Sequence, residues 1–154
     1  MRLLLPLLLA LLATPASAQL KTSDVVQWRV RADRAEAGET ARVVIDAQVR
    51  PGWRLYAMES PVGIPLSLAL DPLPAGLTAG ALRQSQARQG YDPAFESDYP
   101  YFAERARLVQ AVRVGADARP GERQVTGTLR YAVCDDSVCL PPTRTTFRVG
   151  LVVE

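Results

Sequence analysis

The two cysteines of the chain are the residues best suited to carry chemistry. Cys134 and Cys139 are separated by four residues, Asp-Asp-Ser-Val, and are followed by Pro141 and Pro142. Thiols at this spacing can form a disulfide, exchange it with another thiol, or bind a soft metal ion such as Cu(I). The sequence contains no histidine, which excludes Cys-His catalysis, Ser-His catalysis and zinc sites with histidine ligands.

The short spacing argues against a purely structural role for the cysteine pair. On the chain-entropy model, closing a loop of about six residues stabilises a fold by roughly 2 kcal/mol, against about 4.7 kcal/mol for a loop of about 100 residues. A disulfide that joins near neighbours at a turn is also more exposed and more easily reduced than a buried one. From the residues alone, redox activity, a structural bridge and Cu(I) binding with help from Met58 all stay open.

Two acidic residues, Asp135 and Asp136, lie between the cysteines. Nearby negative charge disfavours a thiolate, so we expect both aspartates to raise the pKa of the cysteine thiols unless a folded neighbour such as Arg144 opposes them. The thiolate is the attacking species, so the dithiol would react slowly at neutral pH. We therefore expect the partner's thiolate to start the reaction by attacking the disulfide.

A second candidate segment, residues 91–102, contains half of the aromatic residues of the chain. Its Asp-Pro and Tyr-Pro pairs predict a loop more than a strand. Core packing explains some of these aromatic side chains. So many in one loop are more typical of a lid or a protein-contact surface.

Alternation of polar and apolar residues predicts that antiparallel strands position both segments. The expected strands are residues 25–30, 42–49, 66–70, 106–114, 124–133 and 143–153. The cysteines then bracket a tight turn between two strands, and residues 79–89, which lack an apolar stripe, form strand and loop. Short strands separated by Pro- and Gly-containing turns predict an all-β fold, an immunoglobulin-like antiparallel β-sandwich.

The N-terminus has the pattern of a secretory signal peptide. Met1-Arg2 precedes an apolar run at residues 3–12 and the small residues Ala16-Ser17-Ala18. We expect a signal peptide at residues 1–18, cleaved after Ala18, and one exported domain at residues 19–154. The apolar run is shorter than the roughly 20 residues that span a bilayer, so no membrane insertion is expected after cleavage. Nearly balanced charges give no reason to expect nucleic acid as a partner.

Several segments, taken in order, resemble the periplasmic N-terminal domain of the DsbD thiol:disulfide interchange proteins. Residues 131–142 contain the aromatic residue, cysteine pair and proline pair that precede the last strand of that family. Residues 51–56 look like its Gly-aromatic-x-Leu-Tyr strand, and residues 63–66 look like its G-x-P segment. Residues 91–102 stand where the family has its cap loop. The resemblance covers residues 25–153, with four residues between the cysteines where well-known members have five.

The resemblance implies a role for each thiol and for the aromatic segment. It implies that Cys139 forms mixed disulfides with partners and that Cys134 is the resolving thiol. It also implies a cap loop that covers the disulfide and opens for partners, with Phe95 shielding the sulfurs and Tyr91 and Tyr99 beside it. The residues expected to flank the site are Trp53, Tyr56, Tyr131, Asp135 and Asp136.

The implied function is thiol–disulfide interchange in the periplasm, without a cofactor or a metal. The implied partners are thioredoxin-like periplasmic proteins, which include disulfide isomerases and cytochrome c maturation proteins, and a membrane thiol reductase. Because the sequence ends at Glu154 without a transmembrane segment, that reductase is expected to be encoded separately. Two other functions remain: an immunoglobulin-like binding module with a structural disulfide, and a copper or redox-stress accessory protein.

Overall fold

The computed structural model describes residues 19–93 and 95–154, so the expected signal peptide and its cleavage site lie outside the described residues. The described chain begins with one short helix, α1 (Thr22–Val25). The strands that follow are β1 (Val26–Ala32), β2 (Thr40–Val49), β3 (Arg54–Tyr56), β4 (Ser67–Leu70), β5 (Leu77–Gln84), β6 (Arg88–Asp92), β7 (Ser97–Phe102), β8 (Arg105–Val114), β9 (Gly121–Tyr131), β10 (Val133–Cys134) and β11 (Thr143–Val153).

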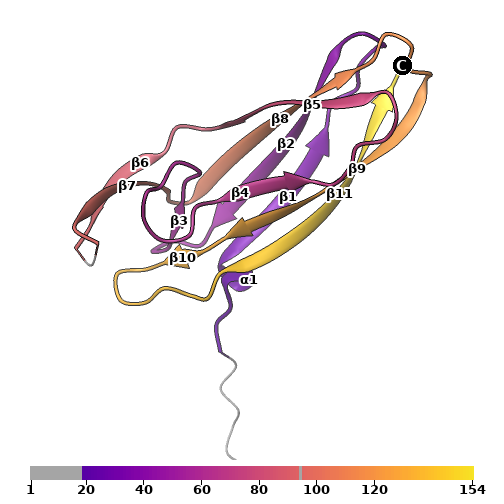
Figure 1. Cartoon of the computed structure of the whole chain (residues 1–154). Helices are drawn as coiled ribbons and strands as arrows, with labels where there is room; N and C mark the ends of the chain where they lie inside the picture. The colour runs from indigo at the N-terminus through magenta and orange to yellow at the C-terminus, as the bar shows by residue number, and fades with distance from the viewer. Residues whose placement is uncertain (1–18, 94) are drawn as a thin grey trace, which may run out of the picture.

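Two larger sheets form the body of the molecule (Figure 1). Their strand orders are β1-β2-β8-β5 and β11-β9-β4, and neighbouring strands pair antiparallel. Side chains from both sheets share one core, in which Ile45 of β2, Leu108 of β8 and Leu129 of β9 are fully buried. These features confirm the predicted all-β, immunoglobulin-like antiparallel fold.

The sequence alternation explains which face of each strand is buried. In β2, Val43, Ile45 and Ala47 point into the core, whereas Arg42, Asp46 and Gln48 on the other face are more exposed and Val44 is buried. In β11 the predicted boundaries match the observed ones, and Leu151 and Val153 are buried.

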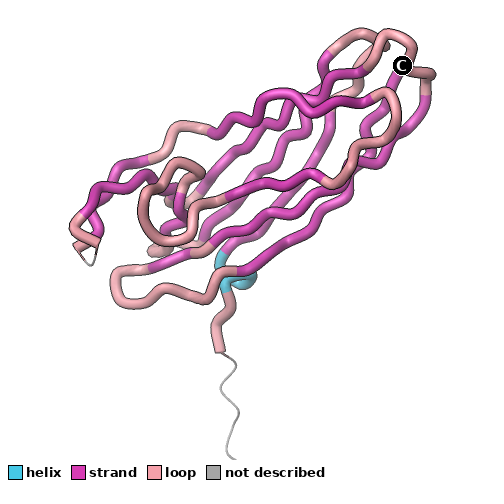
Figure 2. The backbone as a smooth tube through the Cα atoms, in the orientation of Figure 1, coloured by secondary structure: helices cyan, strands magenta, loops and turns pink. Residues whose placement is uncertain are grey.

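A smaller sheet, built from four short strands in the order β10-β3-β7-β6, lies at the end of the molecule away from the C-terminus (Figure 2). The predicted strand at residues 124–133 is divided there. β9 ends at Tyr131 within a large sheet, and after Ala132 the chain continues as β10, which pairs with β3 of the small sheet. This change of partner places Cys134 on the small sheet.

The prediction of a loop at residues 91–102 is wrong, because the segment contributes to a β-hairpin of β6 and β7. Pro93 lies in the turn, where it breaks no ladder. Pro100 lies within β7, and its carbonyl accepts a hydrogen bond from the Ala57 N–H at 3.0 Å. Proline has no N–H to return, and the ladder between β3 and β7 ends at Tyr56.

Helix α1 has no counterpart among the predicted elements. The hydroxyl of its first residue, Thr22, donates a hydrogen bond to the Pro141 carbonyl at 2.6 Å and so ties the N-terminal segment to the chain that follows the cysteines. Among the described residues, no helix has the length and the apolar character that crossing a bilayer requires.

Candidate functional site

Cys134 and Cys139 form a disulfide across a tight turn at the edge of the small sheet. The turn is closed by a hydrogen bond from the Asp135 N–H to the Val138 carbonyl at 2.9 Å. The two cysteines also form an isolated antiparallel bridge, with their Cα atoms 4.0 Å apart. The expectation that the cysteines bracket a turn is confirmed.

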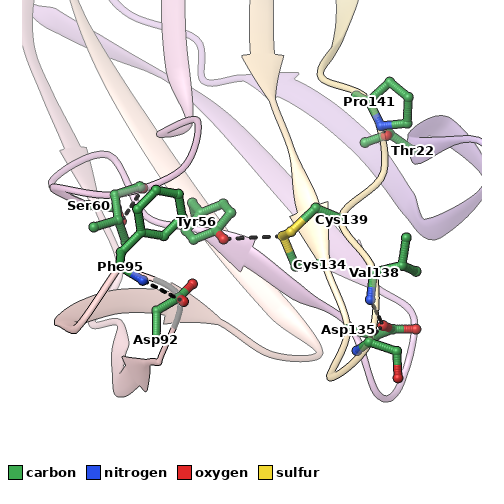
Figure 3. Close-up of a disulfide and its surroundings, with 12 residues drawn as sticks. Thr22, Tyr56, Ser60, Asp92, Phe95, Cys134, Asp135, Val138, Cys139 and Pro141 are labelled. Carbon is green, nitrogen blue, oxygen red and sulfur yellow. Dashed lines mark hydrogen bonds between the residues drawn. A yellow bond between two sulfur atoms is a disulfide. The ribbon is translucent and has the colours of Figure 1, made fainter.

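The two cysteines of the disulfide differ in exposure. Cys134 is 7% exposed and belongs to a small buried cluster, whereas Cys139 is an exposed residue. The Tyr56 hydroxyl lies 3.2 Å from the Cys134 Sγ and points at the disulfide (Figure 3). A thiolate that approaches from solvent therefore meets Cys139 first, and Cys134 is the sulfur that the protein surrounds.

The two acidic residues of the turn have different contacts. The Asp135 carboxylate accepts hydrogen bonds from the N–H groups of Ser137 at 2.8 Å and Val138 at 2.7 Å. These two bonds hold the pKa of Asp135 below its usual value, so this charge is part of the turn itself. Asp136 instead forms an ion pair with Arg54 of β3. The basic neighbour of the turn is thus Arg54, and no contact of Arg144 with the turn is seen in the described part of the chain.

Arg54 is held at the site by three arrangements. It lies directly opposite Cys134 in the ladder between β3 and β10, and opposite residues of an antiparallel pair project from the same face. Its guanidinium pairs with Asp136 and lies 5.7 Å from the centroid of the Tyr101 ring. The hydrogen bond to Asp136 also raises the pKa of Arg54.

A cluster of tyrosines supports the buried side of the disulfide. Tyr56 and Tyr99 are 3% and 6% exposed, and their ring centroids are 5.4 Å apart. Tyr101 continues the row, 5.5 Å from Tyr99. Burial raises the pKa of both Tyr56 and Tyr99, so both hydroxyls stay protonated at neutral pH and can donate hydrogen bonds. Gly63 covers Tyr56, and a Cβ atom there would lie 2.6 Å from the Tyr56 Cζ.

A groove of about 430 Å³ opens between the cysteine turn and the hairpin of β6 and β7. Both cysteines line it, and so do three of the most exposed large apolar side chains of the described residues. These are Tyr91 at 61%, Phe95 at 58% and Val138 at 50% exposure. The Phe95 N–H donates a hydrogen bond to the Asp92 carboxylate at 3.3 Å, which anchors the hairpin tip. The groove combines an accessible sulfur with an exposed apolar rim.

The aromatic residues predicted for the site divide between two locations. Tyr91, Phe95 and Tyr99 of the predicted cap line the groove, together with Tyr56. Trp53 and Tyr131, which the sequence placed beside the site, belong to the main core and do not line the groove. Burial of the aromatic rings between the two large sheets accounts for their position.

Seven of the described residues that line the groove were not among the predicted site residues: Arg54, Gly90, Asp92, Pro93, Tyr101, Ser137 and Val138. Alternation along β3 contained a signal for Arg54, because residues two apart share a face and Tyr56 was already a candidate. The pairing of β3 with β10 and β7, which brings Arg54 to Cys134 and Tyr101 to Tyr56, has no local signal in the sequence.

A larger groove of about 590 Å³ lies elsewhere, on the outer face of the sheet that contains β1, β2 and β8. Asp46 lies in it and pairs with Arg31 of β1 and Arg107 of β8. These ion pairs link neighbouring strands and lower the pKa of Asp46. No cysteine lines this groove, so the disulfide groove is the stronger functional candidate.

The fold and the site define a class: a small β-sandwich that carries a disulfide at one end, with one cysteine buried and the other exposed to solvent. Residues 19–151 match the family described as thiol:disulfide interchange protein DsbD, N-terminal, and the chain belongs to this family. The resemblance found in the sequence is therefore confirmed. No curated protein sequence matches the chain significantly.

Solved structures show a similar fold. The fold is similar to the DsbD N-terminal domain of Neisseria meningitidis in the reduced form, with a TM-score of 0.56, 18% identity, and coverage of 88% of this chain and 95% of that chain. It is also similar to the structure of a complex between the DsbD N-terminal and PilB N-terminal domains of the same organism (TM-score 0.53, 19% identity, 86% and 88% covered). A third likeness is to the N-terminal periplasmic domain of ScsB from Proteus mirabilis (TM-score 0.54, 15% identity, 87% and 49% covered). At these identities the likeness shows the fold.

Proposed function

We propose that this protein relays two electrons between periplasmic proteins by opening and closing the Cys134–Cys139 disulfide. The observation that carries the proposal is the asymmetry of the disulfide, in which Cys139 is exposed in a groove and Cys134 is buried. Membership of the DsbD N-terminal family supports interchange with protein thiols. The exported location and cleavage after Ala18 are part of the proposal.

The relay runs through one mixed disulfide. A thiolate of the donor attacks the Cys139 Sγ, the S–S bond breaks, and its electron pair goes to the Cys134 sulfur. A second donor thiolate then attacks the donor's own sulfur in the mixed disulfide and releases Cys139 as a thiolate. The protein leaves as the dithiol after taking up two protons, and the donor leaves as a disulfide.

Delivery to the acceptor uses the same steps in reverse. The Cys139 thiolate attacks the acceptor's disulfide and forms a mixed disulfide. The Cys134 thiolate then attacks the Cys139 Sγ and expels the acceptor's thiolate. Cys134 is therefore the resolving thiol in this direction and the leaving group in the other.

The partners that suit this groove are thioredoxin-like proteins, with a membrane thiol reductase as the donor. Acceptors of the proposed relay are disulfide isomerases or cytochrome c maturation proteins. The complex of the Neisseria DsbD N-terminal domain with a PilB N-terminal domain supports protein partners for this fold. The exposed Tyr91, Phe95 and Val138 supply the apolar contact area that such a partner would cover.

Trapping of partners tests the relay. A Cys134→Ser variant retains the attacked thiol but cannot resolve, so it should accumulate mixed disulfides through Cys139 when expressed in the periplasm. The matched Cys139→Ser variant retains only the buried sulfur and should trap little. If neither variant traps a protein, and if the disulfide of the native fold survives strong dithiol reductants, then the bond is structural. A reduction potential of the Cys134–Cys139 disulfide well below about −300 mV would also indicate a structural bond.

The cap role of Phe95 and Tyr91 is a separate part of the proposal. Both line the same groove as Cys139, which supports a role in hindering small thiols and yielding to a protein. Phe95→Ala should speed reduction by glutathione several-fold and slow exchange with a thioredoxin-like protein. Leu20→Ala, which removes an exposed apolar side chain outside the groove, is the control. Unchanged rates in Phe95→Ala would remove Phe95 from the cap.

A further inference from the structure

We propose that Arg54 supplies the positive charge that receives the Cys134 thiolate when the disulfide opens, and that Asp136 holds its guanidinium in place while the disulfide is closed. This inference rests on the proposed function, because it concerns the sulfur that leaves when a partner attacks Cys139. It makes Arg54 a positioning residue that acts through the Cys134 sulfur.

The leaving sulfur needs such a partner because it is buried. Cys134 is 7% exposed, and a thiolate formed there loses most of its contact with water. Desolvation disfavours the charged form, so a buried thiolate requires hydrogen-bond donors or a nearby cation. The Tyr56 hydroxyl, 3.2 Å from the Cys134 Sγ, is one donor. A neutral hydroxyl supplies no net charge, and the cation must come from another residue.

Arg54 is the only cationic side chain among the described residues that line the groove. It faces Cys134 across the ladder, and its side chain is only 33% exposed, so water screens it less than a free surface arginine. The other titratable groups around the disulfide are all acidic or phenolic: Tyr91 and Asp92 from β6, Tyr99 and Tyr101 from β7, Tyr56 from β3, and Asp135 and Asp136 from the turn. Without Arg54 these groups would leave the Cys134 thiolate in a negative environment.

While the disulfide is closed and both sulfurs are neutral, the Arg54 guanidinium pairs with Asp136. The Asp136 side chain is 81% exposed, so water can solvate its carboxylate when the guanidinium turns toward sulfur. The Tyr101 ring, 5.7 Å from the Arg54 Cζ, limits how far the guanidinium can move. When the S–S bond breaks, the electron pair goes to the Cys134 sulfur, and the guanidinium of its ladder partner Arg54 needs only to turn from Asp136 toward it.

The experiment measures thiolate formation at Cys134 by ultraviolet absorbance against pH, in a Cys139→Ser background. A Cys134→Ser, Cys139→Ser variant supplies the tyrosine baseline. Arg54→Gln should lower the thiolate fraction at a fixed pH roughly tenfold, because the compensating cation is gone. Arg54→Lys keeps the charge and should stay within about threefold of the parent. Arg144→Gln, which neutralises an arginine outside the groove, is the control and should change nothing.

Asp136→Asn separates charge from structure. This substitution also breaks the ion pair, so a purely structural role predicts that it moves the titration in the same direction as Arg54→Gln. Charge supply predicts the opposite direction, with a larger thiolate fraction, because Arg54 is freed and an anion is removed. The same direction in both variants, or an unchanged titration in Arg54→Gln, overturns the inference. If Arg54→Gln does not fold, Asp136→Asn decides the matter: a larger thiolate fraction supports charge supply by Arg54, and a smaller or unchanged fraction overturns the inference.

Trapping through Cys139 distinguishes the failure of this inference from the failure of the relay. If Cys134→Ser traps partners but substitution of Arg54 does not change the titration of the Cys134 thiol, the relay stands and Arg54 has no part in it. If no variant traps a partner, the relay itself fails. In that event, Arg54 only holds the turn.

Discussion

Two buried tyrosines show how the main core and the disulfide end of the molecule differ. Tyr131 is fully buried between the two large sheets, with its ring 5.1 Å from Trp28 and its hydroxyl 3.1 Å from the Thr145 Oγ1. Tyr56 is 3% exposed in the smaller cluster, and its hydroxyl lies 3.2 Å from the Cys134 Sγ. The two side chains are alike in type and in burial, but their hydroxyls have different partners.

The different partners of the two hydroxyls predict that Tyr131 contributes to stability and that Tyr56 affects the reactivity of the disulfide. The Tyr131 hydroxyl is hydrogen-bonded to the Thr145 hydroxyl, which stays neutral throughout any redox cycle. The partner of Tyr56 is a sulfur, which becomes an anion when the disulfide opens in the proposed relay. Substitutions in the main core should therefore change the free energy of unfolding. Substitutions in the smaller cluster should change how readily the disulfide opens.

The largest expected effect is on the main core. Leu129→Ala removes a fully buried side chain from β9 and should lower the free energy of unfolding by about 2–5 kcal/mol, through lost transfer energy and a cavity. Urea denaturation with the disulfide intact measures this loss. Reduction by dithiothreitol, measured well below the unfolding transition, should change less than twofold. A loss below about 1 kcal/mol would show that the core adjusts to fill the cavity.

A glycine pair tests the smaller cluster. Gly63 has a φ of +67°, and a Cβ atom there would meet the Tyr56 ring, whereas Gly38 has a φ of +87° with nothing within 4 Å. Both Gly→Ala variants carry a backbone penalty of about 1 kcal/mol. Gly63→Ala should lose roughly 1–3 kcal/mol more and should change the reduction rate, because Tyr56 must move.

Equal losses of stability and equal reduction rates in Gly63→Ala and Gly38→Ala would contradict this prediction. They would show that the Tyr56 ring moves aside freely. The position of Tyr56 relative to the sulfur would then not be set by the loop that contains Gly63.

These two regions were also unequally predictable from the sequence. Strands of the main core have regular alternation, and the predicted strand at residues 143–153 matches β11 because Leu151 and Val153 face the core. The small sheet has weak local signals. β3 is three residues long, β10 is two, and β7 contains Pro100. Apart from the resemblance of residues 51–56 to a family strand, it is the tertiary pairing that shows how these segments form a sheet.

The candidate site divides in the same way. The cysteine pair and the turn were predictable because they are continuous in the sequence, whereas the strands within residues 91–102 were not predicted. The partners of each side chain were not predictable either. Asp136 was expected to raise the pKa of the thiols unless a neighbour such as Arg144 opposed it, and the pairing of β3 with β10 gives it Arg54 as a partner instead. Tyr131 directly precedes the cysteine segment, but the sheet change at Ala132 leaves it in the main core.

Removal of single hydroxyls compares the two tyrosines directly. Tyr131→Phe loses its hydrogen bond with Thr145 and should lower the free energy of unfolding by about 1 kcal/mol, with no change in thiol chemistry. Tyr56→Phe loses a donor to the sulfur and should raise the pKa of the Cys134 thiol in a Cys139→Ser background. Denaturation and thiolate absorbance, measured on both variants, should give opposite patterns. If both variants affect only stability, the Tyr56 hydroxyl has no role in exchange.

The smallest expected effect concerns the acidic turn. The backbone N–H groups of Ser137 and Val138 hold the pKa of Asp135 below its ordinary value of 3.8. Because the pKa of Asp135 is lower in the folded protein, its charged carboxylate stabilises the turn at any pH above the ordinary pKa. This stabilisation is lost as the pH falls through the lowered pKa of the folded protein. The turn should therefore keep its hydrogen bonds until the solution is strongly acidic.

The amide signals of Ser137 and Val138 report on this titration, because both N–H groups donate to the Asp135 carboxylate. In the parent protein they should shift in acid, along with a faster exchange of the Val138 amide with solvent. Asp135→Asn keeps an acceptor oxygen but cannot titrate, so its amides should not follow pH. An acid shift of equal size in Asp135→Asn would assign the effect to another group, and the Asp135 charge would then have no part in building the turn that presents Cys139.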